Sequence, residues 1–318
     1  MTIPVIRAVL KQHPAIKISV LTKPVFIEIF REFKKVDLIQ IDTQGRHRGF
    51  LGLLKLRNEL KKLNIDAVVD LHNVLRTNIL KFMWRRNFYQ INKGRKDKSN
   101  LIKGRGFTQI KSTHQRYLDV FNMLNMNVNL SNPTFPKKAN LNKHKIKFEI
   151  DLNKKLVGIA PFAKHKAKTY SIEKMTEIIK KLSKRYFIIL FGGGDKESNI
   201  LEDIANKTNN VINLTKGFTL SDQMDFISNL DLMVSMDSAN GHLAAMYGIK
   251  VITIWGVTHP YGGFLPFNQT IQNSIMVDRE KYPKIPTSIY GDKYPQGYKN
   301  AINSIDPNTI IEKIDQLI

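Results

Sequence analysis

The chain has 318 residues, of which 42% are hydrophobic and 24% charged, so it has the composition of a folded protein long enough for two cores. It contains no cysteine, which excludes disulfides, thiolate metal sites and cysteine nucleophiles. Its net charge is +23, and apolar stretches such as 251–257 are far shorter than the roughly 20 residues that cross a bilayer. Arg7 and Lys11 interrupt the N-terminal apolar residues too early for a secretion signal.

The basic residues are concentrated in the first half of the sequence. Residues 1–150 hold 30 Lys and Arg against 10 Asp and Glu, whereas residues 151–318 hold 20 against 17. A positive field of this kind attracts phosphorylated ligands, anionic lipid headgroups or nucleic acid. Charge alone therefore leaves these three classes of partner open.

In the first half, short β-branched runs alternate with amphipathic segments, a pattern typical of βα units around a parallel sheet. We expect strands at 16–21, 36–41, 67–71 and 88–91, and helices at 3–12, 24–33, 51–63, 74–84 and 113–124. Residues 92–106 form the most basic and least periodic segment of this half, so we expect an exposed loop there.

A polar, lysine-rich stretch with Pro133 and Pro136 precedes a second βα series, and we place the domain boundary at its end, dividing the chain into residues 1–150 and 151–318. The second series predicts strands at 156–160, 186–191, 211–214, 232–235 and 251–255. Both halves are therefore expected to be doubly wound α/β domains.

Three helices of the second half have recognisable starts. Ser171 is a predicted N-cap, Thr219 is a cap with Asp222 three residues later, and Asp306 stands before a proline in the first turn. Residues 260–300 are rich in Gly, Pro, Tyr and Asn and show no regular pattern. A segment of this length is a functional loop or a surface excursion without a ligand, and the sequence leaves both readings open.

The string MVSMDSANGHLAAMY, residues 233–247, joins a buried strand to a helix through a turn of small residues. Small residues allow a ligand close to the backbone, and the N–H groups at the start of a helix favour an anion such as phosphate. The alternative is an ordinary strand-to-helix turn, with Asp237 as the N-cap and His242 as a core histidine.

Two further strand ends carry polar residues. The string LVGIAPFAKHKAKT places Lys164 and Lys168 after a strand, and FGGGDKE places Glu197 after another. In open α/β sheets ligands bind beyond the carboxyl ends of the strands, where lysines neutralise a diphosphate and a carboxylate accepts ribose hydroxyls. The alternative for the lysines is a solvated face.

Other chemistries lack their motifs. No P-loop, HExxH motif or pair of Asp residues separated by one position is present, so the sequence predicts no metal site, and no GxSxG string supports a serine hydrolase. In the first half DLHNVLRT ends a strand, and its arginine joins downstream cations in a predicted cationic rim: Arg76, Arg95, Lys96, Lys98, Lys103 and Arg105. The alternative is ordinary helix-face and loop charge.

The sequence resembles glycosyltransferase family 9, the ADP-heptose:lipopolysaccharide heptosyltransferases. The strings that carry the resemblance are GIAPFAKHKAKTYSIEKM, FGGGDKE, LSDQMDFISNLDLMVSMDSANGHLAA and VITIWGVTHP in the second half, with DLHNVLRT and THQRYLDVFNML in the first. The DSANGHLAA string is the most specific of them.

The resemblance implies a GT-B fold, in which two Rossmann-like domains face a central cleft. The first domain is expected to bind the acceptor and the second the nucleotide-sugar donor, with inversion of the anomeric centre and without a metal or cofactor. The implied donor-binding residues are Lys164, Lys168, Glu197, Asp237, Ser238, Ala239, Gly241 and His242, and the implied acceptor-binding residues are Arg76, Arg95, Lys96 and Lys98. The family usually has glycine where this chain has Ala239.

Family members open with a strand, a Gly-Asp loop and then a helix, and the loop supplies the carboxylate thought to act as base. Here MTIPVIRAVL already looks like that helix. The resemblance thus implies that the first strand and the loop are absent, because Met1 is an internal methionine of a longer chain or the polypeptide is truncated. The catalytic base is then unassigned, and two sheet edges of the first domain are expected to lack a partner strand.

The expected function is transfer of a heptose or related sugar from an ADP-linked donor to the inner core of lipopolysaccharide. The expected location is the cytoplasm, with peripheral contact with the inner face of the membrane, where the basic half meets anionic lipid and no nucleic acid. Two alternatives stay open: a nucleic-acid-binding protein, favoured only by the basic charge, and a catalytically inactive relative that binds a sugar nucleotide.

Overall fold

The computed structural model describes residues 1–84, 87–145, 151 and 153–318, and these fall into two compact units. Unit 1 comprises Met1–Arg95 and Thr113–Thr134, and unit 2 comprises Lys96–Ser112 and Phe135–Ile318. The boundary expected after residue 150 lies in a stretch outside the described residues. The chain belongs to unit 2 from Phe135 onward. The Phe135 ring packs against Gly248 and lies 6.3 Å from the Phe267 ring.

Unit 1 is built from four short strands and the helices around them. The strands are β1 (Ile18–Thr22), β2 (Val36–Gln40), β3 (Val68–Asp70) and β4 (Phe88–Gln90). The helices are α1 (Thr2–Gln12), the 3-10 helix η1 (Pro24–Phe30), α2 (Gly49–Lys61), α3 (Leu75–Trp84) and α5 (Thr113–Asn122). The 3-10 helix stands where the pattern predicts an α-helix.

The four strands form two separate parallel pairs, β1 with β2 and β3 with β4, rather than one sheet. Both pairs share the same apolar cores. Val5 of α1 and Leu118 of α5 pack with side chains of β1 and β3 in one cluster, and Leu56 of α2 and Leu80 of α3 pack with β1, β2 and β4 in the other. In the described part of unit 1, β1 and β3 therefore each have one edge without a partner strand.

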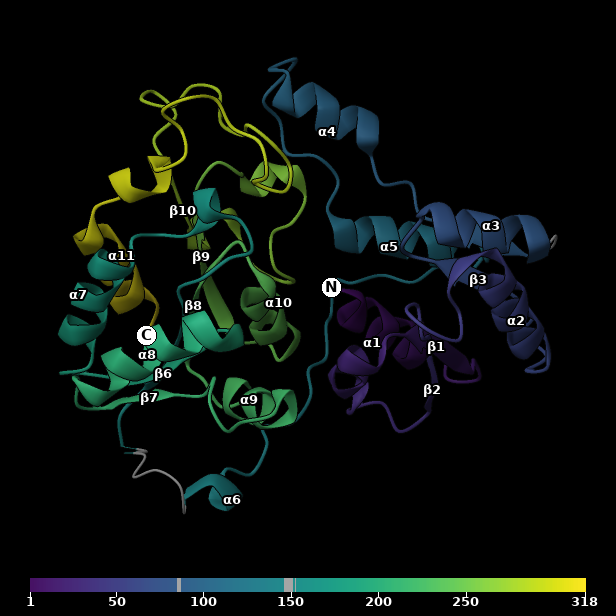
Figure 1. Cartoon of the computed structure of the whole chain (residues 1–318), viewed down its shortest axis with the longest axis horizontal. Coiled ribbons are helices and arrows are strands. Elements are labelled where there is room, and N and C mark those ends of the chain that lie inside the picture. Colours follow the sequence, from purple (N-terminus) through teal and green to yellow (C-terminus); the bar gives the residue numbers. More distant parts are fainter. Residues whose placement is uncertain (85–86, 146–150, 152) are drawn as a thin grey trace. The chain divides into compact units, whose positions relative to one another are not determined.

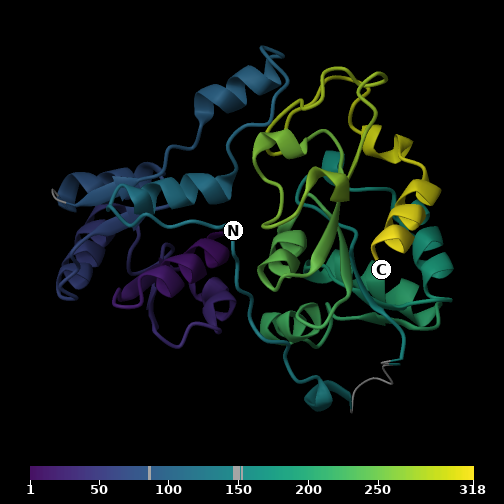
Figure 2. The ribbon, with the colours of Figure 1, turned by 180° about the vertical axis from the view of Figure 1, so that it is seen from behind.

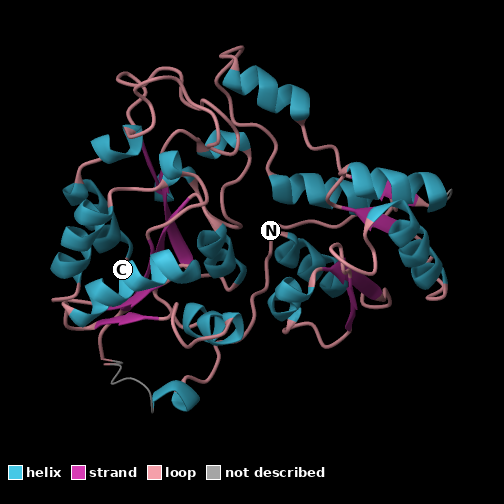
Figure 3. Ribbon diagram, in the orientation of Figure 1, coloured by secondary structure: helices cyan, strands magenta, loops and turns pink. Residues whose placement is uncertain are grey.

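Unit 2 contains a six-stranded parallel sheet with helices on both faces (Figure 3). Its strands are β5 (Leu156–Ala160), β6 (Phe187–Leu190), β7 (Val211–Asn213), β8 (Leu232–Met236), β9 (Lys250–Trp255) and β10 (Ser274–Met276). Its helices are α4 (Arg95–Ile102), α6 (Asn142–Lys145), α7 (Ile172–Leu182), α8 (Gly194–Asn206), α9 (Leu220–Ile227), α10 (Ala239–Met246) and α11 (Pro307–Leu317). Helix α4 begins at Arg95, the last residue of unit 1 before the chain enters unit 2. Short 3-10 helices are η2 (Lys166–Lys168), η3 (Pro260–Gly262), η4 (Ile271–Asn273) and η5 (Ala301–Ser304).

The strand order in unit 2 is β10-β9-β8-β5-β6-β7. One face of this sheet packs with α7, α8 and α11 in the main apolar core, and the yellow α11 lies beside the teal α7 in both views (Figures 1 and 2). Helix α10 packs on the other face, against β8 and β9. Successive side chains of the strands point to opposite faces of the sheet and are buried on both, as expected for a parallel sheet covered on both sides.

Several sequence expectations are confirmed in detail. The Ser171 hydroxyl accepts a hydrogen bond from Lys174 N at the start of α7, Thr219 and Asp222 form a reciprocal capping box on α9, and the Asp306 carboxylate caps α11. The expected loop at 92–106 is wrong over Arg95–Ile102, which form α4 and bury Leu101. None of the described helices combines the length and apolar character that a membrane span requires.

Candidate functional site

The candidate site lies at the carboxyl end of β5, where the sheet of unit 2 reverses its direction of growth. The chain runs from β5 outward to β6 and β7, and then returns to place β8 on the other side of β5. The order of strands therefore reverses beside β5, and in open α/β sheets ligands bind beyond the carboxyl ends of the strands at such a switch point.

The Lys168 side chain, in the loop after β5, reaches across to the loop after β8. Its Nζ donates to the Asp237 backbone oxygen at 2.7 Å and to Asp237 Oδ2 at 3.1 Å. Both residues are only 9% exposed. An ammonium group has three N–H donors, so one donor of Lys168 remains for a ligand.

The Asp237 carboxylate is neutralised within the site. Thr258, which follows β9, donates from its hydroxyl to Asp237 Oδ2 at 3.0 Å, so that this oxygen accepts from both Thr258 and Lys168. A buried carboxylate needs such partners to remain charged. The network thus joins the carboxyl ends of β5, β8 and β9, and it holds the Lys168 ammonium group at a fixed place.

Helix α10 begins immediately after Asp237 and presents its N-terminus to the same place. Its N-cap is Ser238, with an extended backbone and no capping hydrogen bond from its side chain, so the alternative with Asp237 as the N-cap is wrong. The Ser238 hydroxyl is buried and makes no hydrogen bond to any described residue. An uncapped helix start beside a lysine ammonium favours an anion.

Gly241 lies where α10 packs against the sheet. It is buried in α10, and a methyl group at this position would come within 2.5 Å of Ser235 Oγ on β8. The small residue therefore lets α10 approach β8 closely. His242, one residue later, is half-buried, whereas Ala239 at the first helical position is exposed.

Glu197 lies in the first turn of α8, beyond the end of β6. Its Oε2 accepts a hydrogen bond from Gly193 N at 2.9 Å, which holds the carboxylate across the start of the helix. Gly194 has a φ of 75°, a left-handed conformation that glycine adopts without strain.

The predicted site residues are thus only partly brought together. Lys168, Asp237 and Ser238 form one cluster, and Lys164 lies on the exposed part of the loop after β5. The four predicted acceptor residues divide between the compact units, with Arg76 and Arg95 in unit 1 and Lys96 and Lys98 in unit 2. The Lys98 ammonium lies 4.6 Å from the centre of the Phe264 ring.

The sequence analysis missed two residues of the cluster. Thr258 stands in the string VITIWGVTHP, but the string gives no sign that its hydroxyl reaches Asp237. Gly291, in the irregular segment 260–300, packs against Lys168 so closely that an added methyl group would lie 2.6 Å from Lys168 Cγ. The sequence offers only a glycine in an irregular segment as a signal, and the structure gives that glycine a φ of 79°.

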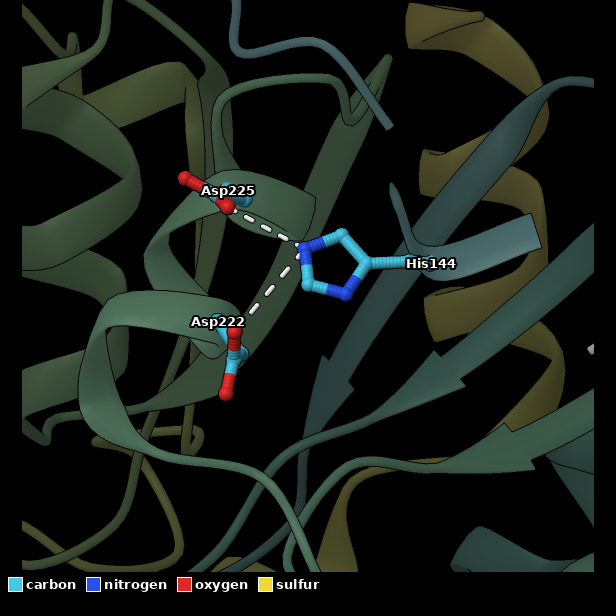
Figure 4. Close-up of side chains that lie close together, drawn as sticks. All are labelled: His144, Asp222 and Asp225. Atoms are coloured by element: carbon cyan, nitrogen blue, oxygen red, sulfur yellow. Dashed lines mark hydrogen bonds and ion pairs between the residues drawn. The ribbon is translucent and has the colours of Figure 1, made fainter. Parts of the chain in front are cut away.

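A second polar cluster in unit 2 joins α6 to α9. His144 Nε2 lies 3.1 Å from Asp225 Oδ2 and 4.0 Å from Asp222 Oδ1, with the histidine on α6 and both carboxylates on α9 (Figure 4). Of the described residues, these three are the group whose ligand atoms lie close enough to hold a metal ion. The His144–Asp225 hydrogen bond by itself satisfies both buried groups, so we assign the cluster to anchoring α6 on α9.

The residues at this switch point suit a phosphorylated ligand. A lysine ammonium with a donor to spare is bonded to Asp237, and the next residue, Ser238, has an unbonded hydroxyl and begins α10. Such fixed donors stabilise negative charge on a departing diphosphate.

Comparison with known proteins places this chain in a family. The model of Glycosyltransferase family 9 (heptosyltransferase) matches residues 53–293. A lipooligosaccharide heptosyltransferase 2 from Campylobacter jejuni subsp. jejuni serotype O:6 is 23% identical over 309 residues, which cover 91% of this chain and 85% of the relative.

Solved structures share the fold over the whole chain. A family 9 glycosyl transferase from Veillonella parvula matches with a TM-score of 0.75 and 16% identity, covering 99% of this chain and 92% of that one. The E. coli heptosyltransferase WaaC with ADP matches with a TM-score of 0.66 and 16% identity, covering 100% and 95%. The chain belongs to glycosyltransferase family 9, the heptosyltransferases, and is a glycosyltransferase with the GT-B fold.

Proposed function

We propose that this enzyme transfers a heptose from an ADP-linked donor to the inner core of a lipopolysaccharide acceptor, with inversion of the anomeric carbon and without a metal ion. The observation that carries the proposal is the Lys168–Asp237 pair beside the start of α10, at the switch point of the unit 2 sheet. A heptosyltransferase of the same fold has been solved with ADP, which supports this nucleotide.

In the proposed reaction a hydroxyl group of the acceptor loses its proton to a general base, to which no residue is assigned, and its oxygen bonds to the anomeric carbon while the bond from that carbon to the diphosphate oxygen breaks. The electron pair of the broken bond leaves on the diphosphate. Lys168 and the N–H groups at the start of α10 hold that negative charge in the place a divalent cation takes in metal-dependent enzymes. The Ser238 hydroxyl provides a further donor to the same phosphate.

Two carboxylates are assigned to the donor's hydroxyl groups. Glu197 uses Oε2 to accept from Gly193 N, and its other oxygen accepts a ribose hydroxyl in our proposal. Asp237 uses Oδ2 for Lys168 and Thr258, which leaves Oδ1 for a hydroxyl of the transferred sugar. Carboxylates that are already held in place discriminate well between sugars, because their lone pairs are not free to turn.

We assign acceptor binding to unit 1 and the cations near α4, with Arg76, Arg95, Lys96 and Lys98 as the residues that meet acceptor phosphates. The exposed positions of Arg76, Arg95 and Lys96 support this role, since long-range attraction to an anionic lipid surface requires charge in contact with solvent. Peripheral contact with the inner leaflet follows from the same argument.

The test is ADP binding by calorimetry to the Lys168→Gln variant. The glutamine amide still donates to the Asp237 carbonyl oxygen but carries no charge, so a charged hydrogen bond to the phosphate is lost. Such bonds contribute about 1.5–3 kcal/mol, which corresponds to roughly a 10- to 100-fold weaker affinity. Lys180→Ala, on the exposed side of α7, is the control and is expected to bind ADP like the wild type. An ADP affinity of the Gln variant within twofold of wild type would contradict the proposed binding of the diphosphate by Lys168.

A further inference from the structure

Unit 2 contains a cavity whose lining includes none of the candidate site residues Lys168, Asp237 and Ser238. Its volume is about 540 Å³, and it lies between residues 101–107, at the end of α4 and just after it, and residues 279–295 of the long irregular segment. Both segments belong to the same compact unit. Cavities that hold small ligands usually measure between about 300 and 1,000 Å³, so this one has the size for a phosphorylated monosaccharide.

The lining of this cavity is cationic. Lys103, Lys284 and Lys293 line it together with Arg279, and the described lining residues include no aspartate or glutamate. No ion pair or hydrogen bond of the three ammonium groups is found within the described residues. Three uncompensated cations around one concavity repel each other, and an anion bound between them relieves that repulsion.

Arg279 is held rigidly on one wall. Its Nε donates to the Ile285 backbone oxygen at 2.8 Å, and its guanidinium carbon lies 3.4 Å from the centre of the Phe107 ring. The Phe107 ring in turn contacts His259 and Tyr261, with ring centres 4.9 and 4.8 Å apart. The wall is therefore preorganised, and binding costs little ordering of these side chains.

The remaining walls suit a sugar ring. Tyr294, Pro283 and Pro295 offer flat apolar faces of the kind that pack on the C–H faces of a pyranose, and Thr287 adds a hydroxyl. Flat rings next to ammonium groups favour a ligand that is partly apolar and anionic. A phosphorylated sugar combines these properties.

The cavity is joined to the donor site by one short loop. Thr287 lines the cavity, and its N–H donates to the Val257 oxygen, next to the Thr258 that bonds Asp237. The Thr287 hydroxyl donates to the Lys293 oxygen, and Gly291 between them packs on Lys168. One side of loop 287–293 thus contacts the proposed diphosphate lysine, and the other side lines the cavity.

We propose that this cationic pocket, lined by Lys103, Arg279, Lys284 and Lys293, binds a phosphorylated sugar, either as part of the acceptor lipid or as a free sugar phosphate. The inference rests on the proposed function for its place beside the donor site. The phosphate lies among the three lysines, and the sugar ring packs on the wall formed by Tyr294, Pro283 and Pro295.

The test is binding of glucose 6-phosphate by calorimetry, with glucose and inorganic phosphate as reference probes. The variant replaces Lys103, Lys284 and Lys293 by alanine, and the control replaces Lys180, Lys181 and Lys184, three exposed lysines of unit 2 that do not line the pocket. Both variants lose the same charge. We expect glucose 6-phosphate to bind at least 10-fold more weakly to the pocket variant, and within twofold of wild type to the control.

ADP binding on the same proteins separates this inference from the donor site. The pocket variant is expected to keep its ADP affinity, and Lys168→Gln to keep its affinity for glucose 6-phosphate. In a further arm, phosphorylated core oligosaccharide freed of its acyl chains competes with glucose 6-phosphate if the acceptor is the source, and fails to compete if the ligand is a free sugar phosphate. The inference is overturned if glucose 6-phosphate does not bind, binds no better than inorganic phosphate, or binds equally to the pocket variant and the control.

Discussion

Lys168 and Asp237 are 69 positions apart in the sequence, yet their side chains form the centre of the candidate site. They meet because β5 and β8 are adjacent and parallel, so that the loops after both strands lie at one edge of the sheet. Thr258 and Gly291 fix the pair from two further segments. An ammonium group that is already held pays little entropy when a phosphate binds.

Gly241→Ala is predicted to destabilise the protein, because the new methyl group meets Ser235 Oγ at 2.5 Å and pushes α10 away from β8. Overpacking of this kind costs about 1–3 kcal/mol of the free energy of unfolding. Urea denaturation measures this loss. The double variant Gly241→Ala with Ser235→Ala removes the hydroxyl in the way and is expected to recover part of the stability. A single variant as stable as the wild type would contradict the close packing.

His259 is predicted to make the protein less stable in mild acid. Burial, aided by the charge of Arg279, lowers the pKa of this histidine from 6.5 to about 4. Between those values the unfolded chain takes up a proton that the folded chain does not, so the free energy of unfolding falls as the pH falls from 7 to 4, by at most about 3 kcal/mol.

His259→Asn isolates this contribution. His259 Nδ1 accepts a hydrogen bond from Tyr261 N at the start of η3, and an asparagine side chain accepts the same bond without titrating. Urea denaturation at pH 7 and pH 5 is expected to show a smaller loss of stability in the variant than in the wild type. An equal loss in both proteins would show that another group carries the pH dependence.

The strands of the two units differ in how many neighbours each has. β1 and β3 each pair with one strand, whereas β5 and β8 each pair with two. Amides on an edge without a partner strand exchange through local opening, which costs less than global unfolding. We predict that peptides covering 18–22 and 68–70 exchange hydrogen for deuterium at least about 10-fold faster than those covering 156–160 and 232–236. Equal protection would contradict the division of the unit 1 strands into separate pairs.

Elements with a strong local signal could be predicted from the sequence. The caps at Ser171, Thr219 and Asp306 are set by neighbouring residues, and the apolar runs of β5 and β8 have the period and length of buried strands. Helix α4 was missed because most of its residues are polar and only Leu101 is buried. Leu101 lines a cavity together with residues of the far segment 279–295, a placement that no local pattern reveals.

The charge imbalance between the halves of the sequence nearly disappears between the compact units. Unit 1 contains 20 Lys and Arg against 8 Asp and Glu, and unit 2 contains 30 against 19. The halves differ in charge but the units hardly do, because two basic segments of the first half, 96–112 and 135–150, belong to unit 2. Unit 2 is therefore itself strongly cationic, which suits the proposed diphosphate ligand and a second pocket that binds an anion.

The molecule's division into units also limits what the sequence could predict about the site. Lys168, Glu197 and the Asp237 turn were found from motifs, because each follows a strand with a recognisable string. The return of 96–112 to unit 2, and hence the cationic pocket, depends on contacts such as Phe107 with Arg279 that join residues 172 positions apart in the chain. Such contacts are decided by packing of the whole unit.

The central claim is that the donor diphosphate binds between the Lys168 loop and the start of α10. The most direct measurement is a crystal structure of the protein with ADP. We predict the terminal phosphate within hydrogen-bond distance of Lys168 Nζ and of the N–H groups or hydroxyl at Ser238, with the ribose at Glu197. A nucleotide bound elsewhere in unit 2, or with its phosphates turned away from Lys168, would contradict the account.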